Sequence, residues 1–294
     1  MPGSALALVI LAGLIHACWN IAAKKIGGDA RFALFSSVLL MVVWAPLGIW
    51  FSWEQVPDYG WPELGVILTS GALHVGYYLV LLRGYRKADL TVVYPLARGS
   101  GPLLSSTMAI LFLGERLSAW GALGIAAVVG GVFLVAGGPA LFRAAHDPAR
   151  HERVRAGIFF GIATGIFIAA YTFVDGWGVK VLGMSPVLID YLGNLVRLAI
   201  LLPLVFIGMR AGLAAVWRAQ WKGALLVAAV SPISYVLVLY AMQVAPLSHV
   251  APAREVSMLF AALIGGHLLS EGDRVMRILG AACIATGVMA LAVG

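Results

Sequence analysis

Residues 88–135 read ADLTVVYPLARGSGPLLSSTMAILFLGERLSAWGALGIAAVVGGVFLV, and residues 245–291 read APLSHVAPAREVSMLFAALIGGHLLSEGDRVMRILGAACIATGVMAL. The first part of the two stretches matches at an offset of 157 residues, pairing Ala88, Leu90 and Pro95 with Ala245, Leu247 and Pro252. One residue is then lost, and the offset becomes 156 for Arg98, Glu115, Gly124 and Gly131, which match Arg254, Glu271, Gly280 and Gly287. A repeat of this length, with Pro and Arg inside apolar runs, predicts two versions of one structural unit.

The composition indicates a membrane protein. The chain is 62% hydrophobic and 11% charged, with a mean hydropathy of +0.97. Soluble domains are about 45–50% apolar and about 25% charged, so this excess of apolar residues must face lipid. We therefore interpret the net charge of +7 as loop charge that orients the chain, not as a nucleic-acid surface. The two cysteines, Cys18 and Cys283, lie in apolar runs without metal or redox spacing.

Ten segments are long and apolar enough to span a bilayer. They cover residues 4–24, 32–52, 62–83, 89–113, 118–137, 156–177, 186–208, 221–242, 247–270 and 275–293. No basic stretch precedes the first, which we interpret as a span and not as a cleaved signal. The predicted fold class is all-α integral membrane. A polar linker, residues 139–155, separates a first five-helix repeat, residues 1–138, from a second, residues 156–294. Because five is odd, the second repeat enters from the opposite side, which predicts inverted repeats around a central cavity near the midplane.

The distribution of basic residues predicts the orientation. Fifteen of the 20 Lys and Arg residues lie in the loops after the odd-numbered spans, and only Arg116 and Lys180 lie in the other loops. Cytoplasmic loops carry the excess of Lys and Arg. We therefore expect a multi-pass protein of the cell (inner) membrane with its odd-numbered loops in the cytoplasm and both termini outside.

Charged residues inside the spans are candidates for function, because a charge in the bilayer is costly and usually faces a cavity or a partner. Arg98 lies near the middle of the fourth span, one helical turn after Tyr94, and Arg254 lies in the matching ninth span, followed by Glu255. Two cations near a pseudo-two-fold axis suit a substrate carboxylate. The alternative is a structural ion pair, for example of Arg254 with Glu255 or with a carboxylate on another helix.

Two other spans carry carboxylates. Asp175, one turn after Tyr171 in the sixth span, either takes part in proton coupling or lies near the surface paired with Lys180. In the seventh span Asp190, Asn194 and Arg197 form one polar stripe. This stripe is either a structural network, in which Asp190 and Arg197 meet through Asn194, or a cavity lining.

Aromatic and neutral polar residues recur near the middle of the repeat-matched spans. They are Trp19 and Asn20 with His16, His74 and Tyr78 with Tyr77, Tyr94, Tyr171, and Ser231 with Tyr235. Core packing explains any single ring, but together these residues predict a cavity for an organic solute. A bare inorganic ion would need converging oxygens instead.

Proline and glycine mark bends and close contacts. Pro95, Pro102 and Pro252 lie inside the fourth and ninth spans, where they weaken the helical hydrogen-bond ladder. Glycines on the fifth and tenth spans predict helix-packing seams used for support or for dimer-like packing; they are Gly121, Gly124, Gly131, Gly280 and Gly287.

Three features carry a resemblance to a known family. They are HACWN at residues 16–20, the YPLARGSGPLL…LFLGERLSAWGALGIAAVVGGVFLV unit, and its second copy PAREVSMLF…LLSEG…LGAACIATGVMAL. The chain resembles the EamA family of the drug/metabolite transporter superfamily over essentially its whole length. The resemblance implies a ten-helix carrier whose cavity is formed by spans 1, 3, 4, 6, 8 and 9. It is most like the YddG-type exporters, which prefer aromatic amino acids. The second copy departs from the pattern, because Leu-Ser-Glu-Gly replaces Leu-Gly-Glu-Arg.

These observations predict a carrier that exports amino acids, aromatic or hydrophobic ones above all, or related metabolites. The expected substrate-binding residues are Trp19, Asn20, His74, Tyr78, Tyr94, Arg98, Tyr171, Ser231, Tyr235 and Arg254, with Arg98 engaging the carboxylate. The alternative is a proton-coupled multidrug exporter of cationic aromatic compounds, in which Asp175 or Glu255 would dominate. We expect a monomer in the lipid bilayer, with a small-molecule substrate and no metal, cofactor, nucleic-acid partner or catalytic motif.

Overall fold

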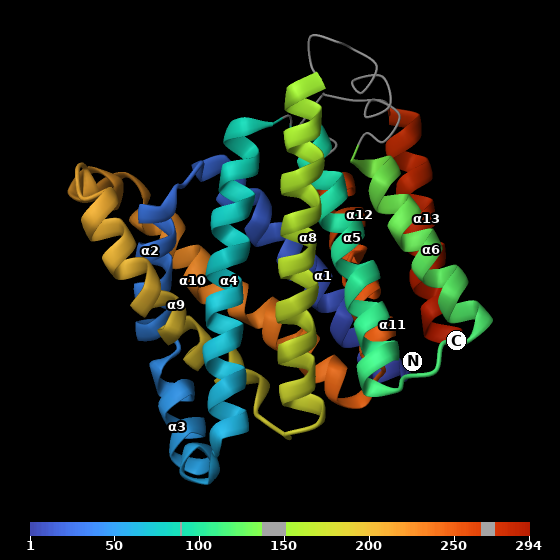
Figure 1. Cartoon of the computed structure of the whole chain (residues 1–294), viewed down its shortest axis with the longest axis horizontal. Coiled ribbons are helices and arrows are strands. Elements are labelled where there is room, and N and C mark those ends of the chain that lie inside the picture. Colours follow the sequence, from blue (N-terminus) through green and yellow to red (C-terminus); the bar gives the residue numbers. More distant parts are fainter. Residues whose placement is uncertain (89, 137–150, 266–273) are drawn as a thin grey trace.

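The computed structural model describes residues 1–88, 90–136, 151–265 and 274–294. All regular structure within these ranges is helical (Figure 1). The first half contains α1 (Gly3–Ile26), α2 (Ala30–Val43), α3 (Ala45–Gln55), η1 (Val56–Asp58), α4 (Trp61–Lys87), α5 (Leu90–Leu113) and α6 (Ala119–Val135). The second half contains α8 (His151–Lys180), α9 (Pro186–Gly208), α10 (Leu213–Val244), α11 (Leu247–Ala253), α12 (Val256–Gly265) and α13 (Arg274–Val293). Most of the predicted linker, residues 139–150, lies outside the described residues.

The described helices have the lengths and hydropathy of membrane spans. Eight candidate spans are present in these ranges, and the bent pair of α2 and α3 makes a ninth. α6, at 17 residues, is a shorter apolar helix at the position of the predicted fifth span. The protein is therefore an all-helical, multi-pass membrane protein, while the count of ten spans stays a prediction.

Two predicted spans are interrupted, and proline accounts for the first break. Residues 32–52 were expected to form one helix, but α2 and α3 meet at Trp44 with a bend of 65°. Pro46, in the first turn of α3, has no N–H to donate to the carbonyl four residues earlier, so the ladder of α2 cannot continue. The ninth predicted span divides into α11 and α12 just after Pro252. Pro252 leaves the Ser248 carbonyl free, and the Ser106 hydroxyl donates to that carbonyl at 2.9 Å.

The glycine seam joins α6 to α13 within the chain, and these helices lie side by side in Figure 1. A Cβ at Gly131 would lie 2.6 Å from the Gly280 carbonyl oxygen, and one at Gly124 would lie 2.9 Å from that of Gly287. Only glycine permits such an approach of two backbones. The expected packing seam is therefore present, and its partner is the other repeat of the same molecule.

Each half of the chain makes the same kind of helix contacts with the other half. α1 packs against α10 as α8 packs against α4, and α1 packs against α12 as α8 packs against α5. The chain termini lie at one end of the bundle, where the Met1 ammonium donates to the Ala292 carbonyl at 2.8 Å (Figure 1). We call this the terminal end. An even number of membrane crossings requires both termini on one side.

Candidate functional site

Three of the predicted aromatic residues meet at the centre of the bundle. The His74 ring of α4 stacks on Tyr171 of α8 with centroids 4.1 Å apart, and the Tyr235 ring of α10 stands edge-on to His74 at 5.6 Å. Tyr77, which the sequence placed beside His74 and Tyr78 but not among the expected substrate-binding residues, reaches the same cluster at 5.9 Å from Tyr171. Its position one turn after His74 is the sequence signal that identifies it. We call His74, Tyr77, Tyr171 and Tyr235 the aromatic cluster.

A buried carboxyl group adjoins the aromatic cluster. The Tyr235 hydroxyl donates to Asp175 Oδ2, while Asp175 Oδ1 has no hydrogen-bond partner in the described part of the chain. Asp175 is 0% exposed. The proposed pairing with Lys180 was wrong, because Lys180 Nζ instead contacts Glu115 at 2.9 Å. Asp175 therefore lies inside the bundle with the Tyr235 hydroxyl as a hydrogen-bond partner. It has no ion pair to a described residue, but Arg197 and Asp190 lie within electrostatic range.

Arg98 is part of a buried ion pair. Its Nη2 atom lies 2.9 Å from Glu255 Oε2 and donates to the Ser257 hydroxyl at 3.0 Å. The Arg98–Glu255 contact is an ion pair by distance, but its angle is not that of a hydrogen bond. The side chains are 16% and 1% exposed. The alternative of a structural ion pair with a carboxylate on another helix is therefore confirmed for Arg98, while the example of Arg254 with Glu255 was wrong. Ser257 is a partner that the sequence did not indicate.

Arg254 lies at the break between α11 and α12, where it caps α11. It is close enough to interact electrostatically with Tyr171 and Tyr235 of the aromatic cluster, and with Arg98 and Glu255. Its side chain makes no hydrogen bond or ion pair to another described residue. The centre of the bundle thus contains one arginine whose charge is paired and one whose charge has no such partner in these ranges.

The remaining predicted residues make contacts outside the aromatic cluster. Trp19 Nε1 donates to the Ser234 hydroxyl at 3.2 Å, so Ser234 occupies the role expected of Ser231, whose carbonyl accepts from Ser234 at 2.8 Å. The Asn20 amide nitrogen lies 3.3 Å from His16 Nε2, and Asn20 is exposed. Tyr78 is half-buried on α4, and Tyr94 packs against the main hydrophobic core.

The polar stripe on α9 contains an ion pair of its own. Arg197 Nη2 contacts Asp190 Oδ1 directly at 3.0 Å. Asn194 does not bridge them as expected; its amide donates to the Ser37 carbonyl of α2 at 3.0 Å. The stripe therefore ties α9 to α2, and Arg197 lies within electrostatic range of His74 and Asp175 of the central site.

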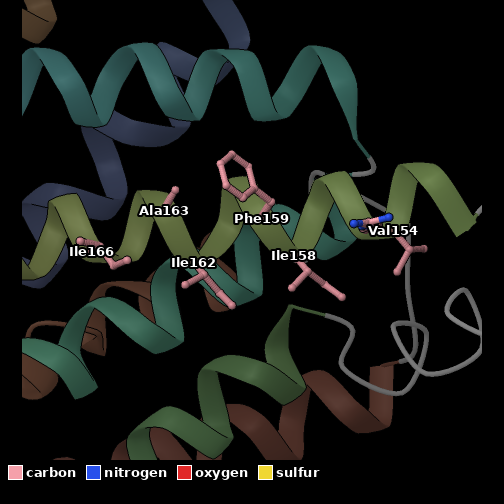
Figure 2. A pocket seen from close by; sticks show the side chains of 7 residues that line it. Val154, Ile158, Phe159, Ile162, Ala163 and Ile166 are labelled. Carbon is pink, nitrogen blue, oxygen red and sulfur yellow. The ribbon is translucent and has the colours of Figure 1, made fainter.

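Two grooves lie away from the centre. Figure 2 shows one, of about 560 Å³, formed entirely on the outward face of α8 between Val154 and Ile166. Phe159 in this groove is 67% exposed, as expected of a side chain that faces lipid. The other, of about 370 Å³, lies between α5 and α6. Neither contains a predicted site residue, and the described ranges hold no group of three or more potential metal ligands.

Membrane-length helices arranged around a polar and aromatic centre are the architecture of a membrane carrier. The chain belongs to the EamA-like transporter family, whose model matches residues 3–137 and again residues 155–293. It is thus a membrane transporter of the drug/metabolite type. A search of curated proteins found no match.

Solved structures share the fold. The crystal structure of one other protein has a TM-score of 0.75 and 14% sequence identity to this chain, and the match covers 99% of both chains. Twenty-nine solved chains match in all. At this level of identity the likeness concerns the fold alone.

Proposed function

We propose that this transporter exports amino acids, aromatic or hydrophobic ones above all, by alternating access. The observation that supports the proposal is Arg254, a guanidinium at the helix break beside the aromatic cluster, with no ion pair or hydrogen bond to another described residue. Guanidinium groups bind carboxylates strongly. Aromatic rings next to such a cation suit a solute that carries a carboxylate and an apolar side chain.

Arg254 replaces Arg98 as the residue to which we assign the carboxylate. Glu255 and Ser257 already occupy the Arg98 guanidinium. A substrate that engaged Arg98 would have to displace a buried carboxylate of the protein, which is costly. Arg98 then sets the position of Glu255 and of the helix break from which Arg254 extends.

A second function is supported by Asp175. Its carboxyl group is buried, has no ion pair to a described residue and accepts a hydrogen bond from Tyr235 of the aromatic cluster. A proton-coupled exporter of cationic aromatic compounds would use such a group, which binds either a proton or the cation. Glu255 is the weaker candidate for this role because Arg98 neutralises it.

We further propose the membrane arrangement. Ten spans would form two inverted five-helix repeats, residues 1–138 and 156–294, in the cell (inner) membrane, with both termini outside and the basic loops in the cytoplasm. The contact between Met1 and Ala292 supports an even number of crossings. The described α6–α13 seam is closed within one chain, which supports a monomer.

Counterflow in proteoliposomes tests the proposed function. Three labelled solutes with the same aromatic ring are compared: an amino acid, the amine without the carboxylate, and the acid without the amine. We expect exchange of the amino acid, loss of exchange for the amine, and no dependence on an imposed pH gradient. Exchange of the amine alone, driven by the pH gradient, would contradict the proposal and support the exporter of cationic compounds.

A further inference from the structure

The loop after α5 connects the two matched units at the terminal end. Glu115 Oε1 accepts hydrogen bonds from the Leu247 amide at 2.8 Å and from Lys180 Nζ at 2.9 Å, and Glu115 Oε2 accepts from the Ser248 amide at 2.8 Å. Lys180 also donates to the Ala245 carbonyl at 3.0 Å. Glu115 belongs to the first unit and all three donors to the second. One carboxylate therefore links the end of α5 to the ends of α8 and α11.

The chemistry of this contact makes it strong. Hydrogen bonds to an ionised group are about twice as strong as neutral ones. Burial by itself raises the pKa of the Glu115 carboxyl. The hydrogen bonds from Lys180 and from the Ser248 and Leu247 amides together lower the pKa by more than burial raises it, so the pKa lies below its usual value. Glu115 is thus ionised at neutral pH.

Side chains between the central site and the terminal end are more buried than those between the site and the opposite end. Toward the terminal end every residue of α11 is buried, and Val179, on the face of α8 that carries Asp175, is 3% exposed. In the other direction Asn20 is exposed, although it shares a helix face with His16, which lies within electrostatic range of Arg98 and Arg254. The site is therefore covered at the end that Glu115 holds.

We propose that Glu115 is the latch of the terminal end, and that the carrier opens there only when Glu115 releases α11 and Lys180. A carrier built from two units exposes its site at each end in turn. A contact that forms in one state and breaks in the other shifts the equilibrium between them. The proposal goes beyond the identity of the solute, since it applies to whatever solute is carried.

A helix cap without any gating role is the simplest alternative, and the chain contains a matched example. Glu63 Oε2 accepts from the Gly60 amide at 2.8 Å at the start of α4. This carboxylate caps its own helix and so joins no two units. Substitution of Glu63 therefore reports the effect of losing a cap alone.

Thiol labelling in lipid nanodiscs tests the latch. The protein has two cysteines, so Cys18→Ser with Cys283→Ser gives a cysteine-free background. Val179→Cys then reports access from the terminal end, and Asn20→Cys reports access from the opposite end. A membrane-impermeant maleimide is used, and its reaction rate with each reporter is measured.

We expect Glu115→Ala to raise the labelling rate of Val179→Cys about tenfold and to lower that of Asn20→Cys, since losing charged hydrogen bonds of the closed state shifts the equilibrium by at least that factor. Lys180→Met should change both labelling rates in the same direction as Glu115→Ala but by a smaller factor, because the hydrogen bonds from the α11 amides to Glu115 remain. Glu63→Ala changes neither rate. Unchanged rates in Glu115→Ala, or rates that rise at both reporters, would overturn the proposal, because loss of packing raises both and a shift between two states does not.

Discussion

α5 and the α11–α12 pair are copies of one sequence element, yet they fold differently. α5 is one helix of 24 residues despite Pro95 and Pro102. Its counterpart breaks into helices of 7 and 10 residues, just after Pro252 and next to the position where one residue has been lost. The matched arginines consequently differ in environment: Arg98 lies inside a continuous helix, and Arg254 lies at a helix end.

The difference shows how a duplicated unit acquires two roles. The break places the Glu255 carboxylate 2.9 Å from the Arg98 guanidinium. The arginine of the continuous helix α5 is therefore neutralised by a carboxylate of the broken pair α11–α12. Arg254 remains beside the aromatic cluster without such a partner in the described ranges. On this account Arg98 stabilises the centre of the bundle and Arg254 binds the solute.

The largest effect is expected from breaking the Arg98–Glu255 pair. Glu255→Gln leaves a buried guanidinium without its counter-charge, which costs about 3–5 kcal/mol of stability. The double variant Arg98→Met with Glu255→Met removes both charges and should recover most of that loss. Thermal unfolding in detergent, followed by tryptophan fluorescence, measures both. If the single variant were as stable as the parent, the ion pair would not hold the centre together.

The second largest loss of stability is expected at the seam between α6 and α13, where the two repeats remain alike. Gly131→Val places a side chain against the Gly280 carbonyl and should cost about 1–3 kcal/mol through overpacking. The adjacent Gly130 is exposed, and a Cβ there would meet no atom of another helix within 4 Å, so Gly130→Val is the matched control with little effect. Equal unfolding temperatures for the two variants would show that the seam is not tight.

The smallest expected effect is that of pH on the contact between Glu115, after the end of α5, and the start of α11. Because the folded-state pKa of Glu115 is lowered, its stabilisation is fully present above the usual glutamate pKa and is lost only as the pH falls through the lowered value. Between about pH 6 and 8 the ratio of Val179→Cys labelling rates in the parent and in Glu115→Ala should therefore stay constant. A ratio that changes over this range would assign the gating to another titrating group.

The class of protein and several local features were accessible from the sequence. Hydropathy predicted the membrane helices, and the glycine pattern predicted the packing seam. The i, i+7 spacing gave contact between Asp190 and Arg197, through Asn194, as one of two alternatives, and the structure shows the contact without Asn194. Each of these depends on residues near one another in the chain or on one periodic face, so a linear pattern contains the information.

The sequence did not predict which side chains on different helices pair with one another. The sequence offered a pair of Arg254 with Glu255 or with an unspecified carboxylate on another helix, and a pair of Asp175 with Lys180, as alternatives. The structure pairs Glu255 with Arg98 and Lys180 with Glu115. Which side chains meet depends on how each helix is rotated and tilted, and on whether a proline bends or breaks it. Pro95 and Pro252 look alike in sequence, yet only the second is followed by a break.

The affinity of Arg254→Gln for an aromatic amino acid tests the central claim most directly. Isothermal titration of the purified transporter should give a Kd about 100-fold weaker than that of the parent, which corresponds to about 2.7 kcal/mol, with an unchanged unfolding temperature. Arg254→Lys, which keeps the charge but loses the planar fork, should lie in between. An unchanged Kd in a stably folded Arg254→Gln protein would contradict the assignment of the solute carboxylate to Arg254.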